Sequence, residues 1–308
     1  RAVFAASANG VLVCMMGSNQ TRTQLRWLDR GGKSLGDVGE PADYTYGGVP
    51  DISPDGRSAV MPIANRDRGT SDVWMIDLET GRRRKLTVDT EDHPGAAWAP
   101  DGKSVIVNTP DVGGMIRIAI DGTASERILA DTDYQWPQSA WGSVLLYQPN
   151  TVSDILALQL TGDRKSTELV ATKAFETTAE FSPDGRLVAY ASDETGRFEV
   201  FVAAYPQPGA RWQVSQDGGA EPRWCRDGRE LSYVDRENYL VSIDVQHSAA
   251  GFETGASKRL FQFHGAGGAW RYDVSSDGNR FLVTAPLEED LASPVTLITD
   301  WTRKVEER

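Results

Sequence analysis

A short turn sequence recurs along the chain at nearly regular intervals, and no other feature limits the possible fold so strongly. Five copies end in Asp-Gly, with their glycines at 56, 102, 185, 228 and 278, and two weaker copies end at Gly10 and Gly142. Successive glycines are separated by 46, 46, 40, 43, 43 and 50 residues. A β-propeller blade takes about 40–45 residues, whereas a leucine-rich repeat is much shorter. The spacing therefore predicts a propeller.

Each turn is flanked by two predicted strands. An aromatic or β-branched residue stands four positions before the glycine, as at Trp98, Phe181 and Trp224, and an alternating apolar run such as 187–190 follows it. Alternation around an Asp-Gly turn is a strong hairpin signal. Third and fourth strands follow in most repeats, as at 198–202 and 212–214. We expect the three aromatic residues to be buried between blades, because a four-stranded sheet buries little until it is stacked on its neighbours.

Seven turns predict seven four-stranded antiparallel blades in one all-β domain spanning 1–308. The expected blades are roughly 1–40, 41–88, 89–131, 132–172, 173–217, 218–264 and 265–303. Six blades is the alternative, if the N-terminal segment belongs to a different unit. No segment has a helical apolar period of useful length.

Composition excludes several classes of partner and site. Lys and Arg number 32 against 44 Asp and Glu, giving a net charge of −12, which argues against nucleic acid. No apolar run reaches the length of a membrane span, so no membrane contact by this chain itself is expected. Cys14 and Cys225 lie in different repeats and, together with only three histidines, predict neither a disulfide nor a metal site. The chain begins in mid-pattern without a signal peptide, which suggests a piece of a longer polypeptide.

The repeats also resemble a known family. Asp-Gly turns led by Ser-Pro or Ala-Pro, with an aromatic residue ahead, look like the TolB-type propeller repeat. The stretches 181–200, 212–224 and 272–283, and the ending 293–301, resemble the C-terminal propeller of bacterial, eukaryotic-like serine/threonine protein kinases. The likeness extends from about Phe4 to Trp301, although Cys225-Arg226 and Ser276 depart from the usual turn residues.

In that kinase family, a membrane span separates a cytoplasmic kinase domain from a repeat region outside the membrane. The resemblance therefore implies an extracytoplasmic (periplasmic) sensor module of a membrane-anchored parent. The sequence of 1–308 holds none of the motifs of a kinase domain. We expect the module to bind a protein, a peptide or a small molecule.

The sequence offers no recognisable catalytic machinery. It has no Gly-x-Ser-x-Gly motif, and His93, His247 and His264 fall in three different repeats. We therefore predict no enzymatic activity, no cofactor and no metal. The alternative is a propeller hydrolase resembling the lactonases, with a metal ion held in the central channel by carboxylates and amides.

The best candidates for a binding site precede the inner strands, where the chain enters each blade near the mouth of the channel. Loops on one face of a propeller can vary because the sheets supply the stability. Aromatic and charged side chains around a concave centre suit a peptide or a small polar ligand. The candidates are Tyr46, His93, Trp136, Glu176, Glu221, Trp270 and Arg271.

Overall fold

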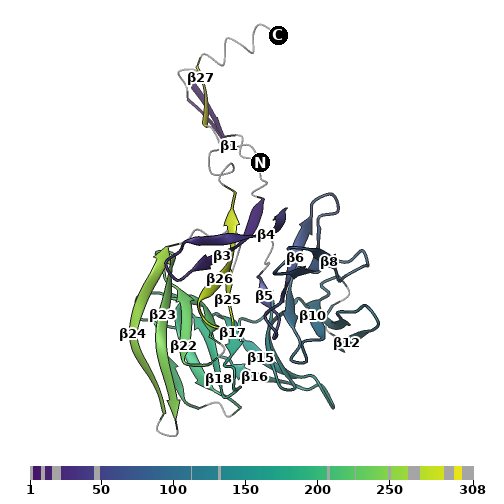
Figure 1. The fold of residues 1–308 in the computed structure, drawn as a ribbon, viewed down its shortest axis with the longest axis vertical. Helices are drawn as coiled ribbons and strands as arrows, with labels where there is room; N and C mark the ends of the chain where they lie inside the picture. The colour runs from purple at the N-terminus through teal and green to yellow at the C-terminus, as the bar shows by residue number, and fades with distance from the viewer. Residues whose placement is uncertain are drawn as a thin grey trace.

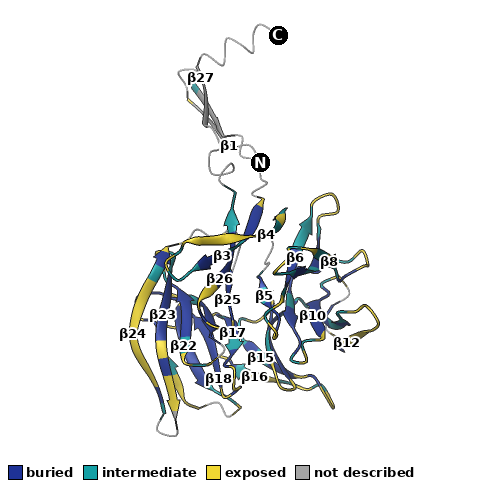
Figure 2. Ribbon diagram, in the orientation of Figure 1, coloured by how far each residue is buried: buried dark blue, intermediate teal, exposed yellow. Residues whose placement is uncertain are grey.

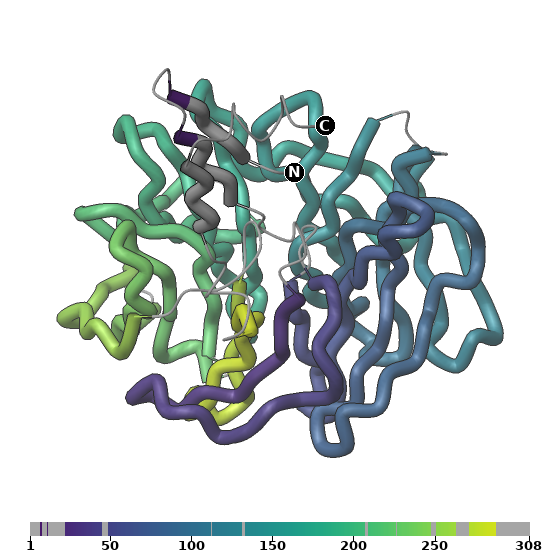
Figure 3. The backbone as a smooth tube through the Cα atoms, turned by 90° about the horizontal axis from the view of Figure 1, so that it is seen from above, coloured from purple at the N-terminus to yellow at the C-terminus, as the bar shows by residue number. Residues whose placement is uncertain are grey.

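Six four-stranded antiparallel sheets follow one another around a central channel in the computed structural model (Figures 1 and 3). The structure describes residues 3–7, 11–15, 22–44, 49–111, 113–130, 133–206, 209–225, 227–248, 251–262, 271–287 and 295–299. This part of the chain contains strands and turns but no helix, as the sequence predicts. Consequently no helix of the described part could cross a membrane.

Five blades are each built from four consecutive strands, with the inner strand first. Blade 1 has β5 (Asp51–Ile52), β6 (Ser58–Asn65), β7 (Thr70–Asp77) and β8 (Arg83–Lys85), and blade 2 has β9 (Ala96–Trp98), β10 (Ser104–Asn108), β11 (Met115–Ala119) and β12 (Ser125–Leu129). Blade 3 has β13 (Gln135–Trp141), β14 (Val144–Pro149), β15 (Ile155–Gln159) and β16 (Ser166–Val170). Blade 4 has β17 (Glu176–Phe181), β18 (Leu187–Ser192), β19 (Glu199–Ala204) and β20 (Arg211–Gln213). Blade 5 has β21 (Ala220–Trp224), β22 (Glu230–Val234), β23 (Tyr239–Ser248) and β24 (Gly251–Gln262).

Blade 6 combines the two ends of the chain. Its inner strands are β25 (Tyr272–Val274) and β26 (Arg280–Pro286), and its outer strands are β3 (Thr23–Asp29) and β4 (Ser34–Ala42). Strands β26 and β3 pair along their whole length, from Arg280 opposite Asp29 to Pro286 opposite Thr23. This pairing closes the ring.

The predicted count of seven blades is wrong, and the alternative of six is confirmed. The sequence indicates each strand but not its partner, so it predicts separate blades, 1–40 and 265–303, for the N-terminal strands and the final repeat. They share one blade instead. The remaining terminal strands, β1 (Val3–Ala6), β2 (Val11–Met15) and β27 (Val295–Thr299), form a separate three-stranded sheet. The turn at Gly10 lies outside the described residues.

The blades are held together by apolar packing between their faces. Trp98, Phe181 and Trp224 are only 6%, 5% and 5% exposed, which confirms the prediction that they are core residues. Trp224 packs in one cluster with side chains of blades 4 and 5. The outermost strand β24 is largely exposed, in contrast to the inner strands (Figure 2).

The turns have the chemistry that their sequences predict. In blade 4, the Ser182 hydroxyl donates to Asp184 Oδ1 at 2.7 Å, and the same oxygen accepts the backbone N–H of Arg186. Gly185 has φ +68°, a conformation that costs glycine little. A Cβ there would also lie 2.1 Å from the ring of Trp141 in blade 3, so Gly185 is needed for space as well.

We predict that Trp224→Ala lowers the free energy of unfolding by about 3–5 kcal/mol, because it leaves a cavity between two blades. Trp141→Ala is the matched control, since Trp141 is 40% exposed, and its loss should be less than half as large. Urea unfolding of both variants measures the two losses. Equal losses would contradict the burial of Trp224.

Candidate ligand site at the channel mouth

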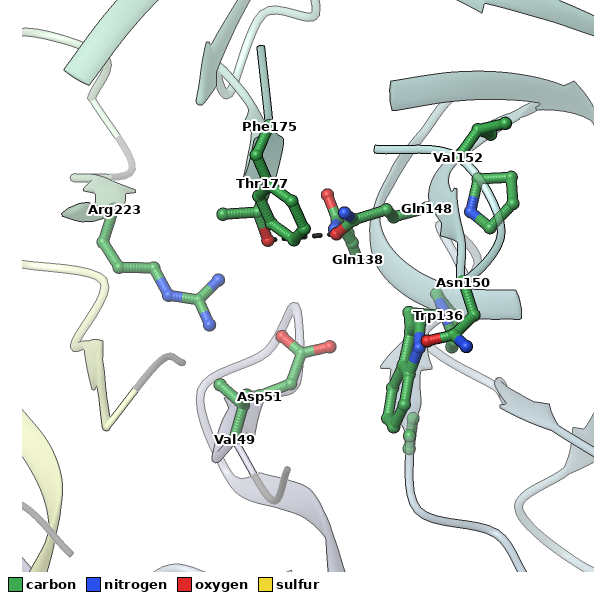
Figure 4. Close-up of a pocket in the computed structure, with 14 residues that line it drawn as sticks. Val49, Asp51, Trp136, Gln138, Gln148, Asn150, Val152, Phe175, Thr177 and Arg223 are labelled. Carbon is green, nitrogen blue, oxygen red and sulfur yellow. Dashed lines mark hydrogen bonds between the residues drawn. The ribbon is translucent and has the colours of Figure 1, made fainter. Parts of the chain in front are cut away.

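A pocket of about 270 Å³ opens at the end of the channel where the inner strands begin (Figure 4). Blades 1, 2, 3, 4 and 5 all contribute to it. Apolar side chains and small residues form much of its wall, and amide, hydroxyl and charged groups complete it. The lining residues are Val49, Asp51, Gly95, Ala96, Trp136, Pro137, Gln138, Gln148, Pro149, Asn150, Val152, Phe175, Thr177 and Arg223.

Small residues of blade 2 make room for this pocket. Gly95 and Ala96 line it, and the next residue of β9 is Ala97. A Cβ at Gly95 would lie 3.2 Å from Trp136 Cε3, so a larger residue there would press on the Trp136 ring. The pocket therefore extends to the seam between blades 2 and 3, where small residues of blade 2 leave room beside the Trp136 ring.

An amide network fixes one wall. Gln138 Oε1 accepts the backbone N–H of Ala179 at 2.7 Å, and Gln138 Nε2 donates to Gln148 Oε1 at 3.2 Å. The Thr177 hydroxyl also donates to Gln148 Oε1, at 3.0 Å. These bonds tie blade 3 to blade 4 and hold three polar side chains in place around the pocket.

Charged residues occupy one repeated position of the inner strands, directly before the aromatic or β-branched residue that precedes the turn. Asp51, Glu180 and Asp273 each accept the backbone N–H of that residue in the next blade. The bonds run from Trp98 N to Asp51 (2.7 Å), from Trp224 N to Glu180 (3.1 Å) and from Ile52 N to Asp273 (2.7 Å). In blade 3, Ser139 accepts from Phe181 N in the same way. These side chains therefore link neighbouring blades by hydrogen bonds, and we call them staples.

Blade 5 carries Arg223 at this position, and blade 2 carries Ala97. The Arg223 side chain is 5% exposed, and it lies 3.9 Å from a Glu180 oxygen and 3.8 Å from an Asp273 oxygen. Burial alone would lower the pKa of Arg223, but Asp273, Glu180 and Asp51 outweigh it and raise that pKa, so the guanidinium stays charged. Three carboxylates therefore surround one buried cation in the channel.

A second hollow of about 830 Å³ opens towards the other end of the channel, where the Asp-Gly turns lie. It shares Asp51, Gln138 and Arg223 with the first pocket. Asp51, Gln138 and Arg223 thus stand between the two hollows and form the floor of the first one, and Glu180 and Asp273 lie behind this floor in the second hollow.

The structure places Trp136, among the sequence-predicted candidates, in the wall of the pocket. Tyr46 and Trp270 lie outside the described residues. The other four candidates are bonded within the protein and are absent from the pocket lining. The single binding surface that the sequence suggested therefore stays a prediction.

His93 and Glu176 are completely buried. His93 Nδ1 lies 2.8 Å from the backbone oxygen of Asn108, and Nε2 lies 2.8 Å from Asp89 Oδ1, so the ring fixes the entry to blade 2. Glu176 accepts a hydrogen bond from the Thr172 hydroxyl, and burial raises the pKa of its carboxyl.

Glu221 and Arg271 form an ion pair between blades 5 and 6. The Glu221 carboxylate accepts the backbone N–H of Arg271 at 2.7 Å and its Nε–H at 2.9 Å. Arg271 also donates to Asn238 Oδ1. Glu221 has φ +57°, in a bulge of β21 that turns its side chain towards the neighbouring blade.

Sequence reasoning missed the floor of the site. A signal existed, because the residue before the aromatic or β-branched position is Asp51, Glu180, Arg223 and Asp273 in four of the five Asp-Gly repeats. A charge repeated on inner strands marks the channel axis. The amide pair Gln138 and Gln148 had no such signal, since it depends on the register of β13 and β14.

Comparison with known proteins supports the fold class, and no protein family model matches the chain. The structure is similar to a protein assigned as TolB from Agrobacterium tumefaciens, with a TM-score of 0.63 and 15% identity over 86% of this chain and 98% of that one. It is also similar to TolB from Acinetobacter baumannii, with a TM-score of 0.53 and 12% identity over 92% and 79%. A protein assigned as a 6-phosphogluconolactonase from Bacteroides uniformis gives a TM-score of 0.55 and 13% identity over 91% and 96%.

These identities are low, so the likeness establishes the architecture alone. The chain is a TolB-like β-propeller in fold, as its repeats indicated. Proteins with and without enzyme names share this architecture, so the function must be argued from the site.

Glu180 gives the site a pH-dependent stability. Burial raises the pKa of its carboxyl from 4.5 to about 8, although Arg223 acts in the opposite direction. Between these two values Glu180 is protonated more fully in the folded state than in the unfolded state, so its contribution to stability falls as pH rises from about 5 to about 8.

We therefore predict that Glu180→Gln has a flatter profile than the wild type in urea unfolding at pH 5.0, 6.5 and 8.0. Glutamine keeps the acceptor for the backbone N–H of Trp224 but cannot ionise. Glu126→Gln, at an exposed side chain, is the control and should follow the wild type. Parallel profiles for all three proteins would show that Glu180 ionises normally.

Proposed function

We propose that this propeller is a non-catalytic recognition module that binds a small ligand, or a side chain of a peptide or protein, in the pocket at the channel mouth. One observation carries the proposal, namely that the pocket combines aromatic walls with a fixed polar and charged floor. Sites for small molecules in proteins usually combine these two features. Its volume of about 270 Å³ suits a small molecule or one long side chain.

The resemblance of the repeats to kinase-associated propellers supports a proposal about the location and the parent protein of this module. We propose that it lies outside the cytoplasm, as the sensor region of a membrane-anchored serine/threonine kinase. The sequence encoded upstream of Arg1 tests this, because it should contain a membrane span and a kinase domain. An upstream sequence with neither would contradict the kinase assignment and leave the pocket unaffected.

A propeller enzyme of the lactonase type is the second candidate. It is favoured by the three carboxylates in the channel and by the structural likeness to the protein assigned as a 6-phosphogluconolactonase. The carboxylates, however, are engaged as staples between blades. Within the described ranges, no three His, Cys, Asp or Glu side chains are grouped as ligands for a metal ion.

We predict that Ala96→Leu abolishes ligand binding, because the larger side chain fills the pocket from the wall formed by β9. Thermal-shift measurements with a panel of free amino acids, dipeptides, organic amines and sugar lactones would compare it with the wild type. Ala124→Leu makes the same change at an exposed residue of blade 2 and is the control.

The wild type and Ala124→Leu should be stabilised by the same panel members, and Ala96→Leu by none. Stabilisation that persists in Ala96→Leu would place the site elsewhere. Turnover of a lactone that is lost on adding a chelator would instead support the enzyme.

A further inference from the structure

We infer that the pocket binds an organic cation, an ammonium or guanidinium group carried on an apolar stem. Both a lysine side chain and a small free amine have this chemistry. The inference rests on the proposed function and specifies the chemical class of the ligand.

The charge of the floor, taken with the two carboxylates behind it, favours a cation. Asp51, Glu180 and Asp273 face the single guanidinium of Arg223, a formal charge of −2, or −1 when Glu180 holds a proton. Arg223 is the one cation among the fourteen lining residues, and Glu180 and Asp273, which lie within 4 Å of it, are not among them. Asp51 does line the pocket. In a site of low dielectric, an added positive charge would offset this excess of negative charge.

The position of Asp51 indicates where in the pocket the cation would bind. Figure 4 shows the Asp51 carboxylate pointing into the pocket between the guanidinium of Arg223 and the ring of Trp136. Its Oδ2 accepts the N–H of Trp98 at 2.7 Å, which helps to fix the side chain. An ammonium group beside Trp136 would gain both a carboxylate and an aromatic face, and cations bind favourably to the face of tryptophan.

The surroundings of the floor favour an anion less than a cation. It would bind Arg223 in a pocket that Asp51 also lines, and Glu180 and Asp273 already lie within 4 Å of that guanidinium. The backbone N–H groups next to these carboxylates are already bonded to them. The floor therefore resembles the surroundings of a cation more than a binding site for a carboxylate or phosphate.

The walls above the floor fit the stem. Trp136, Pro137, Pro149, Val152 and Phe175 line the pocket, and Phe175 and Val152 are both 44% exposed at its rim. Outside the pocket, Phe198 packs edge-on against Phe175 with ring centroids 6.0 Å apart and is 39% exposed. A lysine presented by a peptide could place neighbouring apolar residues on this pair of rings, whereas a small amine would not reach Phe198.

Four probes, three of them matched in size, test the inference by isothermal titration calorimetry on the whole chain. They are the Nα-acetyl N-methylamides of lysine, norleucine and glutamate, together with n-pentylammonium. The two cations should bind, each with a Kd at least tenfold lower than those of the norleucine and glutamate probes. Preference for either of those two probes, or no binding by the cations up to millimolar concentration, would overturn the inference.

Variants then locate the interaction. Asp51→Asn keeps an oxygen acceptor for Trp98 N and should raise the Kd of the lysine probe at least tenfold. Asp217→Asn, at a side chain that is 94% exposed, should leave it unchanged. An unchanged Kd in Asp51→Asn would contradict the assigned position of the cation.

The outcomes separate this inference from the proposed function. Binding of the glutamate or norleucine probe that Ala96→Leu abolishes would keep the pocket as the site and reject the cation. Binding of the cations that Ala96→Leu leaves intact would reject the pocket itself.

A fifth probe, acetyl-Leu-Lys-Leu-amide, distinguishes a lysine of a partner protein from a free amine. Tighter binding of this peptide than of n-pentylammonium, reduced by Phe198→Ser for the peptide alone, would indicate a lysine from a partner protein. Equal affinities that are unaffected by Phe198→Ser would indicate a free amine.

Discussion

The pairing of β26 with β3 is the interaction on which the rest of the structure depends. It joins residues 280–286 to residues 23–29 and so turns a row of six sheets into a ring. An open row would leave the outer faces of its first and last blades in water, whereas closure buries both faces of every blade. Only in the closed ring do the six inner strands face a common axis. The channel and its pocket are therefore consequences of one antiparallel pairing between residues about 250 positions apart.

The contacts between neighbouring blades then determine the charge of the channel and the space that is left in it. Asp51, Glu180 and Asp273 are used as acceptors for the next inner strand, which fixes the strands but places negative charge at the axis. Arg223 partly balances that charge. Where blade 2 carries Ala97 instead of a polar side chain, the adjacent small residues leave the pocket open. The contacts between blades and the pocket thus depend on the same or adjacent positions of the repeat, with different side chains.

Much of the fold could be predicted from local signals. Asp-Gly turns and alternating strands are short-range features, so the blade architecture and the burial of Trp98, Phe181 and Trp224 followed from them. The number of blades did not, because pairing between the chain ends leaves no local mark in the sequence. For the same reason Glu221 and Arg271 looked like loop residues, although they form an ion pair across a seam. Trp136 could be anticipated as a wall of the pocket, but the Gln138–Gln148 contact depends on strand register.

Hydrogen exchange tests the closure of the ring most directly. Peptides covering residues 23–29 and 280–286 should exchange as slowly as those of the interior strands β10 and β18, and they should lose protection together as urea is added. That result would show that the two ends of the chain unfold with the ring as one unit. Rapid exchange in either peptide, or loss of protection at different urea concentrations, would contradict a ring closed by β26 and β3.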